Sequence, residues 1–251
     1  MKLMNQILFF SALMLISCSS VQAAGSDPHW SYEGDEGPEH WAELSAKYSM
    51  CRDGMNQSPV DLVADFHVGL PELVFEYHGT PIHETNNGHT IMLMVSGDNY
   101  LDVPEKKWRF KLLQGHFHSP SEHTINGESF PMEIHLVHEH EDGRLAVVGV
   151  MVEEGEEDAM LNRIWSFMPE KVGESQESPL TVFEAGVLPP TRNYFSYGGS
   201  LTTPPCSEGV QWIVLRDPLT ASAEQIARFK ERVGSSTNRP TQPHHARMIL
   251  D

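Results

Sequence analysis

The sequence predicts a single domain that is mainly β, with a few short helices. Its 251 residues suit one large domain, and 39% of them are hydrophobic, which is enough for a buried core. Short apolar or alternating segments closed by Gly, Pro, Asn or Asp recur through the middle of the chain, whereas helical spacing is rare. No internal repeat or low-complexity linker divides the sequence, so one domain is the simplest interpretation.

Five segments are predicted to be strands, because each is short, apolar or alternating, and bounded by turn residues. They are residues 73–77, 90–95, 108–114, 132–138 and 145–152. The dipeptides Asn87-Gly88, Asn126-Gly127 and Asp142-Gly143 indicate turns next to these segments.

Two segments are predicted to be helices. Residues 157–167 place apolar side chains at helical spacing. Residues 223–232 follow Ser222, a residue type that commonly caps a helix N-terminus, and carry Ile226 and Phe229 three positions apart.

The N-terminus has the features of an export signal. Lys2 supplies a positive charge, residues 7–16 form an apolar run, and Val21-Gln22-Ala23 is a small-residue cleavage site. The apolar run is too short to span a bilayer as a helix. We therefore predict a signal peptide over 1–23, a catalytic domain over 24–251, and a periplasmic or secreted protein.

A second processing route uses Leu15-Ile16-Ser17-Cys18, which resembles a bacterial lipobox in which Cys18 would be lipidated. The free form is favoured because Val21-Gln22-Ala23 follows at the usual distance. Both routes export the protein, and attachment to a membrane is expected only if Cys18 is lipidated.

Charge and cysteine content narrow the classes of partner and compartment. The formal net charge is −18, so a nucleic-acid partner is not expected. Outside the leader only Cys51 and Cys206 remain, an even number that suits a disulfide in an oxidising compartment. Two buried free thiols are the alternative at this point.

The segment Gln114-Gly115-His116-Phe117-His118 carries a metal-binding pattern. In a strand, residues two apart point to the same face, so His116 and His118 present two imidazoles side by side. His135 lies in the next predicted strand, and the Asn126-Gly127 turn makes a hairpin-like connection that brings it near the first two. Three His ligands with one open position form a catalytic zinc site.

Two polar neighbours are in register with these ligands. Gln114 and Glu133 each lie two residues from a ligand, on the same strand face, where they can accept the second ring N–H of an imidazole. The alternative is an accidental pattern, because the chain has 14 His. His138 and His140 would face away from His135 and are interpreted as surface or sheet-packing residues.

Blocks along almost the whole mature chain resemble the alpha-class carbonic anhydrases. The first is the zinc-binding pattern itself, followed by Ser121-Glu122-His123-Thr124 and Glu133-Ile134-His135-Leu136-Val137-His138. The others, in chain order around it, are Gly37-Pro38-Glu39-His40-Trp41, Asn56-Gln57-Ser58-Pro59-Val60, Asn86-Asn87-Gly88-His89, Tyr197-Gly198-Gly199-Ser200-Leu201-Thr202-Thr203-Pro204-Pro205-Cys206 and Asn238-Arg239-Pro240.

The resemblance implies a large, twisted, mostly antiparallel sheet of about ten strands with zinc at the base of a central cone. It implies a lyase that hydrates carbon dioxide reversibly to bicarbonate and a proton through zinc-bound hydroxide. It also raises a homodimer as an expectation. The alternative is a catalytically silent binding or zinc-handling protein of the cell envelope.

The resemblance also assigns roles. His116, His118 and His135 match the zinc ligands, Thr202 and Glu122 match a pair that orients the nucleophile by hydrogen bonding, and His89 matches the proton shuttle. Thr203 is expected to contact substrate, and Tyr32 and Asn87 to hold the water chain. The apolar wall for carbon dioxide matches Val137, Val147, Leu201 and Trp212.

Two further positions complete the comparison with the family pattern. Cys51 and Cys206 match a disulfide of bacterial members. Met92 departs from the pattern, because a polar amide is expected there, and it predicts a less wet side of the cavity.

Overall fold

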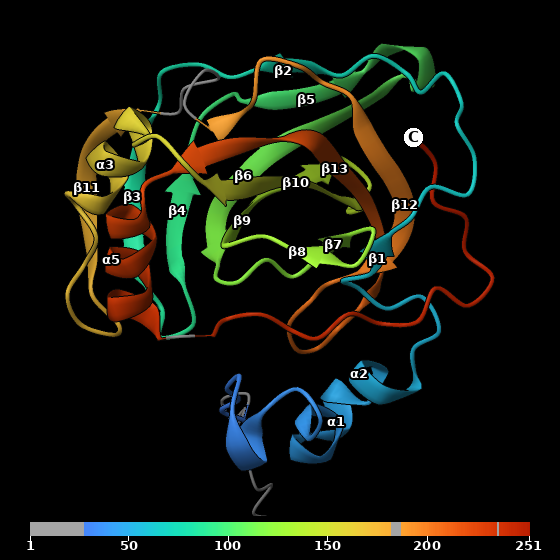
Figure 1. Ribbon diagram of the computed structural model, residues 1–251, viewed down its shortest axis with the longest axis horizontal. Helices are drawn as coiled ribbons and strands as arrows, with labels where there is room; N and C mark the ends of the chain where they lie inside the picture. The colour runs from blue at the N-terminus through green and yellow to red at the C-terminus, as the bar shows by residue number, and fades with distance from the viewer. Residues whose placement is uncertain (1–27, 182–186, 235) are drawn as a thin grey trace, which may run out of the picture.

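A ten-stranded sheet organises the structure, a computed structural model that describes residues 28–181, 187–234 and 236–251 (Figure 1). The predicted leader 1–23, with its cleavage site and Cys18, lies outside the described residues. The strands run in the order β11, β3, β4, β6, β9, β10, β13, β12; β5 pairs with the first part of β6 and also with β2. Neighbours are antiparallel except β10 and β13. The predicted fold class is therefore confirmed.

Each of the five predicted segments corresponds to a strand of this sheet: β2 and β4 are shorter than predicted, and β6, β9 and β10 are longer. The strands of the sheet are β2 (Val74–Glu76), β3 (Pro81–Asn86), β4 (Ile91–Val95), β5 (Tyr100–Val103), β6 (Trp108–His118), β9 (Met132–His140), β10 (Leu145–Glu154), β11 (Ser175–Thr181), β12 (Tyr194–Ser200) and β13 (Glu208–Ala221). A second, small sheet joins β1 (Asp61–Leu62), β7 (Thr124–Ile125) and β8 (Glu128–Ser129). Positive φ angles at Asn126 and Gly127 form the turn between β7 and β8.

The two faces of the central strands differ in character. On β9, Ile134 and Leu136 pack into the larger core, while the alternate residues Glu133 and His135 point to the opposite face. On β6 the same alternation is interrupted, because its register with β9 shifts between Leu112 and Gln114. This bulge moves the even-numbered side chains that follow it to the face of His135.

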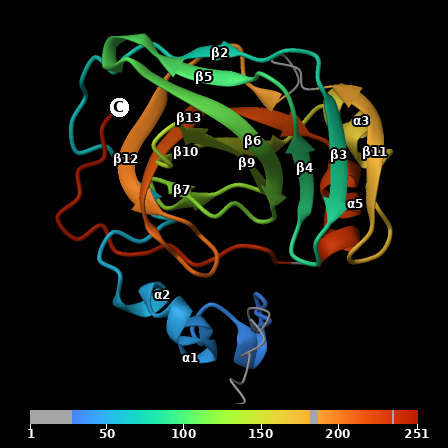
Figure 2. The ribbon, with the colours of Figure 1, turned by 180° about the vertical axis from the view of Figure 1, so that it is seen from behind.

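The larger core covers one face of the sheet and includes two helices, α3 (Ala159–Trp165) and α5 (Ala223–Val233). They lie at the end of the sheet near β11, β3 and β4 (Figures 1 and 2). Ser222 caps α5 in a reciprocal capping box with Gln225, as its sequence predicts for the cap. Phe117 of β6 packs edge-on against Trp165, which ties these helices to the centre of the sheet.

The N-terminal and C-terminal segments lie outside the main sheet. Short helices η1 (Gly34–Glu36), α1 (Trp41–Leu44), η2 (Ala46–Tyr48) and α2 (Met50–Asp53) form a separate layer beneath it (Figure 1), and η3 (Pro104–Lys106) follows β5. The C-terminal tail returns to the sheet, where Leu250 bridges to Ser196 of β12. Among the described residues, no helix is long and apolar enough to cross a membrane.

Candidate metal centre and active-site cavity

Three imidazoles meet at the centre of the sheet. His116 and His118 lie two apart on β6, and His135 on β9 is paired directly opposite His116. The ring centroids of His116 lie 5.0 Å from those of His118 and 5.1 Å from those of His135. One ring nitrogen from each residue lies within 4.8 Å of those of the other two. The antiparallel register of the two strands therefore creates the cluster.

Each imidazole is oriented by a hydrogen bond through its other ring nitrogen. His116 Nδ1 lies 2.8 Å from Gln114 Oε1, and His135 Nε2 lies 2.9 Å from Glu133 Oε1. These are the two partners that the strand spacing predicts. His118 Nδ1 lies 2.5 Å from the backbone oxygen of Thr237. Three nitrogens remain for a ligand: Nε2 of His116, Nε2 of His118 and Nδ1 of His135.

The free nitrogen of His118 is available to bind a cation. His118 is 1% exposed, and its Nε2 has no hydrogen-bond partner among the described residues. A buried polar atom without a partner is costly unless another group satisfies it. A second cluster of possible ligands, His123, Glu133 and His135, shares His135 with the first. In that cluster the Glu133 carboxylate already bonds to both rings.

The three imidazoles are neutral at pH 7. Burial lowers the pKa of His116 well below 6.5, and the nearby rings of His118 and His135 lower it further. Burial lowers the pKa of His118 to about 4 and also lowers the pKa of His135. Neutral rings leave lone pairs available to a metal, so this donor set suits a divalent ion such as zinc.

Glu133 anchors a buried network behind the ligands. Its Oε2 accepts backbone N–H groups from Glu122 and His123, while its Oε1 contacts the rings of His123 and His135. Burial alone would raise the pKa of this carboxyl, but its two imidazole partners hold the pKa well below its usual range. The charged carboxylate therefore fixes the orientation of His135. Tyr197 closes the network with its hydroxyl on His123 Nε2 at 2.6 Å.

Glu122 and Thr202 lie together beside the ligands. Glu122 is 1% exposed, its Oε1 accepts the backbone N–H of Arg239 at 2.8 Å, and its Oε2 lies 3.5 Å from His118 Nε2. Burial raises the pKa of Glu122 to about 7, against the lowering effects of His135, the Arg239 N–H and the Thr202 side chain. Oε2 has no hydrogen-bond partner of ordinary geometry among the described residues, so it is the oxygen available to the Thr202 hydroxyl.

His89 lies at the edge of the site and stacks on Trp30. The two ring centroids are 3.8 Å apart with an interplanar angle of 7°, and His29 lies 6.0 Å from His89 on the outer side. Burial lowers the pKa of His89, and the positive charge of His29 lowers it further. The side chain of Asn87 accepts the backbone N–H of His89 at 2.9 Å, which fixes the turn that presents the ring.

A cavity of about 150 Å³ opens over the three imidazoles. Every side chain that the resemblance assigns to the site, apart from Glu122, Glu133 and the two cysteines, lines it. Its walls therefore include Tyr32, Asn87, His89, Gln114, Val137, Val147, Leu201, Thr202, Thr203 and Trp212. Met92 lines it too, paired with His116 across β4 and β6, so the position at which the resemblance implies an amide contributes an apolar side chain to the wall.

Sequence reasoning missed three contributors. Thr237 orients His118 although it lies 119 residues away. Trp30 supports the ring of His89, and Arg239 holds Glu122. Arg239 falls in the last matching block, Asn238-Arg239-Pro240, which could have drawn attention to it, but no local pattern marks the carbonyl of Thr237.

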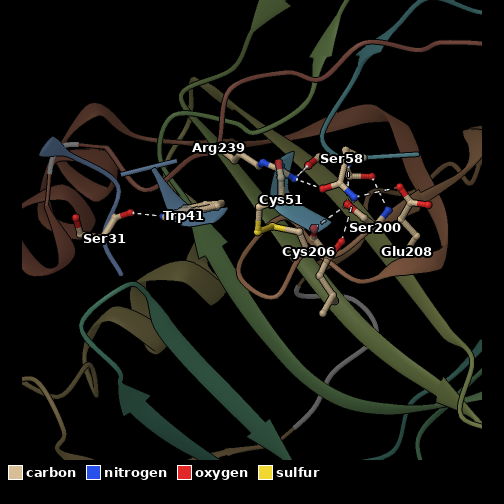
Figure 3. Close-up of a disulfide and its surroundings, with 10 residues drawn as sticks. Ser31, Trp41, Cys51, Ser58, Ser200, Cys206, Glu208 and Arg239 are labelled. Atoms are coloured by element: carbon tan, nitrogen blue, oxygen red, sulfur yellow. Dashed lines mark hydrogen bonds between the residues drawn. A yellow bond between two sulfur atoms is a disulfide. The ribbon is translucent and has the colours of Figure 1, made fainter. Parts of the chain in front are cut away.

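The predicted disulfide joins Cys51 to Cys206 (Figure 3). It links the N-terminal layer to the loop that begins at Leu201 and carries Thr202. That loop is closed by a backbone hydrogen bond from Leu201 to Ser207 at 2.9 Å and by another from Cys206 to Thr203 at 2.9 Å.

Comparisons with known proteins agree on one family. The sequence profile of the eukaryotic-type carbonic anhydrases matches residues 36–251. A carbonic anhydrase of Klebsiella pneumoniae is 42% identical over 241 residues, which cover 96% of this chain and 97% of the relative. The alpha-carbonic anhydrase of Thermovibrio ammonificans, solved with the inhibitor sulfanilamide, superposes with a TM-score of 0.86 at 41% identity. That match covers 90% of this chain and all of the other.

A relative with a different name is also similar. Dioscorin DB3L of Dioscorea polystachya is 33% identical over 257 residues, which cover 97% of this chain and 93% of that protein. Proteins that are named carbonic anhydrases and proteins that are not are thus both similar to this chain. Function must therefore be inferred from the residues of the site.

Proposed function

Because this chain belongs to the eukaryotic-type, or alpha, carbonic anhydrase family and is a carbonic anhydrase, we propose how its own residues hydrate carbon dioxide to bicarbonate and a proton. The proposal gives the three free imidazole nitrogens of His116, His118 and His135 to zinc. The unpartnered, buried Nε2 of His118 is the observation that carries it. A zinc ion with three neutral imidazole ligands lowers the pKa of a bound water to about 7 and so supplies a hydroxide nucleophile at neutral pH.

Thr202 and Glu122 orient the reacting oxygen in this proposal. An ionised Glu122 can only accept, so the Thr202 hydroxyl must donate to it and keep its own lone pairs for a donor in the cavity. A divalent cation near His118 favours this ionised form, because Glu122 Oε2 lies only 3.5 Å from His118 Nε2. The hydroxyl then selects a ligand atom that carries a hydrogen and fixes its direction.

The apolar wall binds the gas. Val137 on β9, Val147 on β10 and Trp212 on β13 occupy adjacent positions across three paired strands, and all three line the cavity. Their apolar surfaces suit a nonpolar, linear molecule that has no strong hydrogen-bonding groups. Leu201 extends this wall next to Thr202, and Thr203 offers a polar group to the bicarbonate product.

His89 removes the proton. Its ring lines both the inner cavity and a groove on the outer side that includes His29, so it can exchange protons with buffer. Its lowered pKa keeps the ring neutral, and therefore ready to accept a proton, at neutral pH. Tyr32 and Asn87 line the path between His89 and the ligands.

The proposed location is the periplasm or the exterior of the cell. The disulfide supports it, because such bonds persist in oxidising compartments. Homodimer formation and lipidation of Cys18 stay predictions.

Stopped-flow hydration of carbon dioxide tests the proposal. Zinc-loaded protein is compared with His116→Ala and with the control His140→Ala, which removes a histidine from the same strand as His135 but outside the cluster. We expect His116→Ala to lose at least about a hundredfold in kcat/KM, because a ligand is removed, and His140→Ala to keep its activity. Absence of hydration by a folded, zinc-loaded wild type would leave a binding or zinc-handling role.

A further inference from the structure

Arg239 is a buried cation with an unusual set of partners. Its side chain is 2% exposed, and no carboxylate forms a salt bridge with it among the described residues. The guanidinium donates instead to three neutral oxygens: Gln57 Oε1 at 2.9 Å, the backbone oxygen of Ser58 at 2.9 Å and that of Cys51 at 2.8 Å (Figure 3). Two separate nitrogens of the planar guanidinium make these three bonds, an arrangement that the single nitrogen of a lysine does not reproduce.

The charge of this side chain persists at neutral pH. Burial lowers the pKa of Arg239 to about 10, and the nearby carboxylate of Glu122 opposes that effect. A charged group inside a protein is costly, so it persists where its hydrogen bonds are complete. The Trp41 ring also packs against the guanidinium, with its centroid 5.7 Å from Arg239 Cζ.

The main chain of the same residue holds the carboxylate of the proposed orienting pair. The backbone N–H of Arg239 donates to Glu122 Oε1 at 2.8 Å. Because Glu122 Oε2 faces His118, this bond determines how the carboxylate is rotated relative to the ligands.

The side chain of Arg239 reaches the other member of the pair through Gln57. The amide oxygen of Gln57 accepts from Arg239, while its Nε2 donates to the backbone oxygen of Cys206 at 3.0 Å and to Glu208 Oε1 at 3.2 Å. Cys206 ends the short loop that presents Thr202, and it bonds back to Thr203 within that loop. One residue therefore contacts Glu122 directly and the Thr202 loop through a single bridging amide.

We propose that Arg239 is a positioning residue that sets the geometry of the Thr202–Glu122 pair. Its N–H fixes the carboxylate, and its guanidinium, through Gln57, fixes the loop that carries the hydroxyl. This inference rests on the proposed function of that pair. When the Thr202 hydroxyl is positioned to donate to Glu122, it can only accept a hydrogen bond from a ligand. Anions that carry a hydrogen should then bind in preference to anions that carry none.

The test compares Arg239→Lys with Arg247→Lys. Arg247 is the control, because its guanidinium also donates to three neutral oxygens, here the backbone oxygens of Gly198, Pro243 and His244, without contacting Glu122 or the Thr202 loop. The probes are bisulfide, which carries a hydrogen, and azide, which carries none. Their dissociation constants are measured by calorimetry on zinc-loaded protein, beside kcat/KM for hydration and the thermal unfolding midpoint.

Arg239→Lys should reduce the preference for bisulfide over azide by about tenfold, the effect of one charge-assisted hydrogen bond. Its kcat/KM should fall by a similar factor, while Arg247→Lys keeps both values. A lower unfolding midpoint with an unchanged anion preference would show a purely structural role and overturn the proposal.

A second variant covers the case in which Arg239→Lys does not fold. Gln57→Met has a similar shape, leaves Arg239 in place and removes the bridge to Cys206, so the same loss of preference should appear, at about threefold. An unchanged preference in this variant overturns the proposal. The wild type separates this proposal from the proposed function. If it prefers bisulfide over azide but does not hydrate carbon dioxide, the result counts against the proposed function alone.

Discussion

At the scale of single residues, His89 differs from the other side chains of the site in what its ring contacts. Its ring faces the cavity on one side and the groove with His29 on the other, and Trp30 supports it from beneath. None of these contacts holds a metal or orients a substrate. We therefore predict that the residue affects proton transfer without affecting the attack on carbon dioxide.

Replacement of His89 should slow only the step that depends on buffer. We expect His89→Ala to lower kcat by about tenfold or more in dilute buffer, with kcat/KM preserved and with recovery in concentrated imidazole. In the wild type, kcat should rise with pH through a pKa below 6.5, because burial and His29 lower the pKa of His89 and only the neutral ring accepts a proton. His83→Ala, a half-exposed histidine on β3, is the control. Equal kcat in dilute buffer for both variants would contradict the assignment.

The register of strands β6 and β9 brings the three imidazoles together. The alternation His116, Phe117, His118 predicts two imidazoles on one face, and that prediction holds because Phe117 enters the core. The bulge between Leu112 and Gln114 was not foreseen. The sequence does carry a signal, because its large apolar residues change from even positions, such as Leu112, to the odd position Phe117. A bulge allows the side chains at both ends of β6 to pack into the same core.

Gly149 on β10 lies opposite His135 and leaves room for the carboxylate behind it. A Cβ atom at this position would lie 2.9 Å from Glu133 Oε1, closer than such atoms pack. We expect Gly149→Ala to displace Glu133, misorient His135 and weaken zinc binding by about 10–100-fold, the usual effect of losing a ligand's hydrogen-bond partner. Competition with a chelator measures this affinity. Gly198→Ala is the control, because its Cβ would meet nothing within 4 Å; equal affinities in the two variants would contradict the account.

Across the whole molecule, the sequence predicts more of the sheet than of the segments that surround it. Alternating or apolar patterns located the central strands, and the helical spacing that follows Ser222 located α5. The contacts of Thr237 with His118 and of Arg239 with Gln57 join residues 119 and 182 positions apart, and their partners are backbone oxygens and a neutral amide. Such pairings leave no periodicity or charge pattern in a sequence, so they emerge only when the chain is folded.

The position of the metal tests the central claim most directly. The account predicts that a crystal of the zinc-loaded protein, measured at the zinc absorption edge, shows one anomalous peak bonded to His116 Nε2, His118 Nε2 and His135 Nδ1 at about 2.0–2.1 Å. The alternative cluster of His123, Glu133 and His135 lies close enough to be distinguished by the same map. A peak in that cluster, or full zinc loading with no peak among the three imidazoles, would contradict the account.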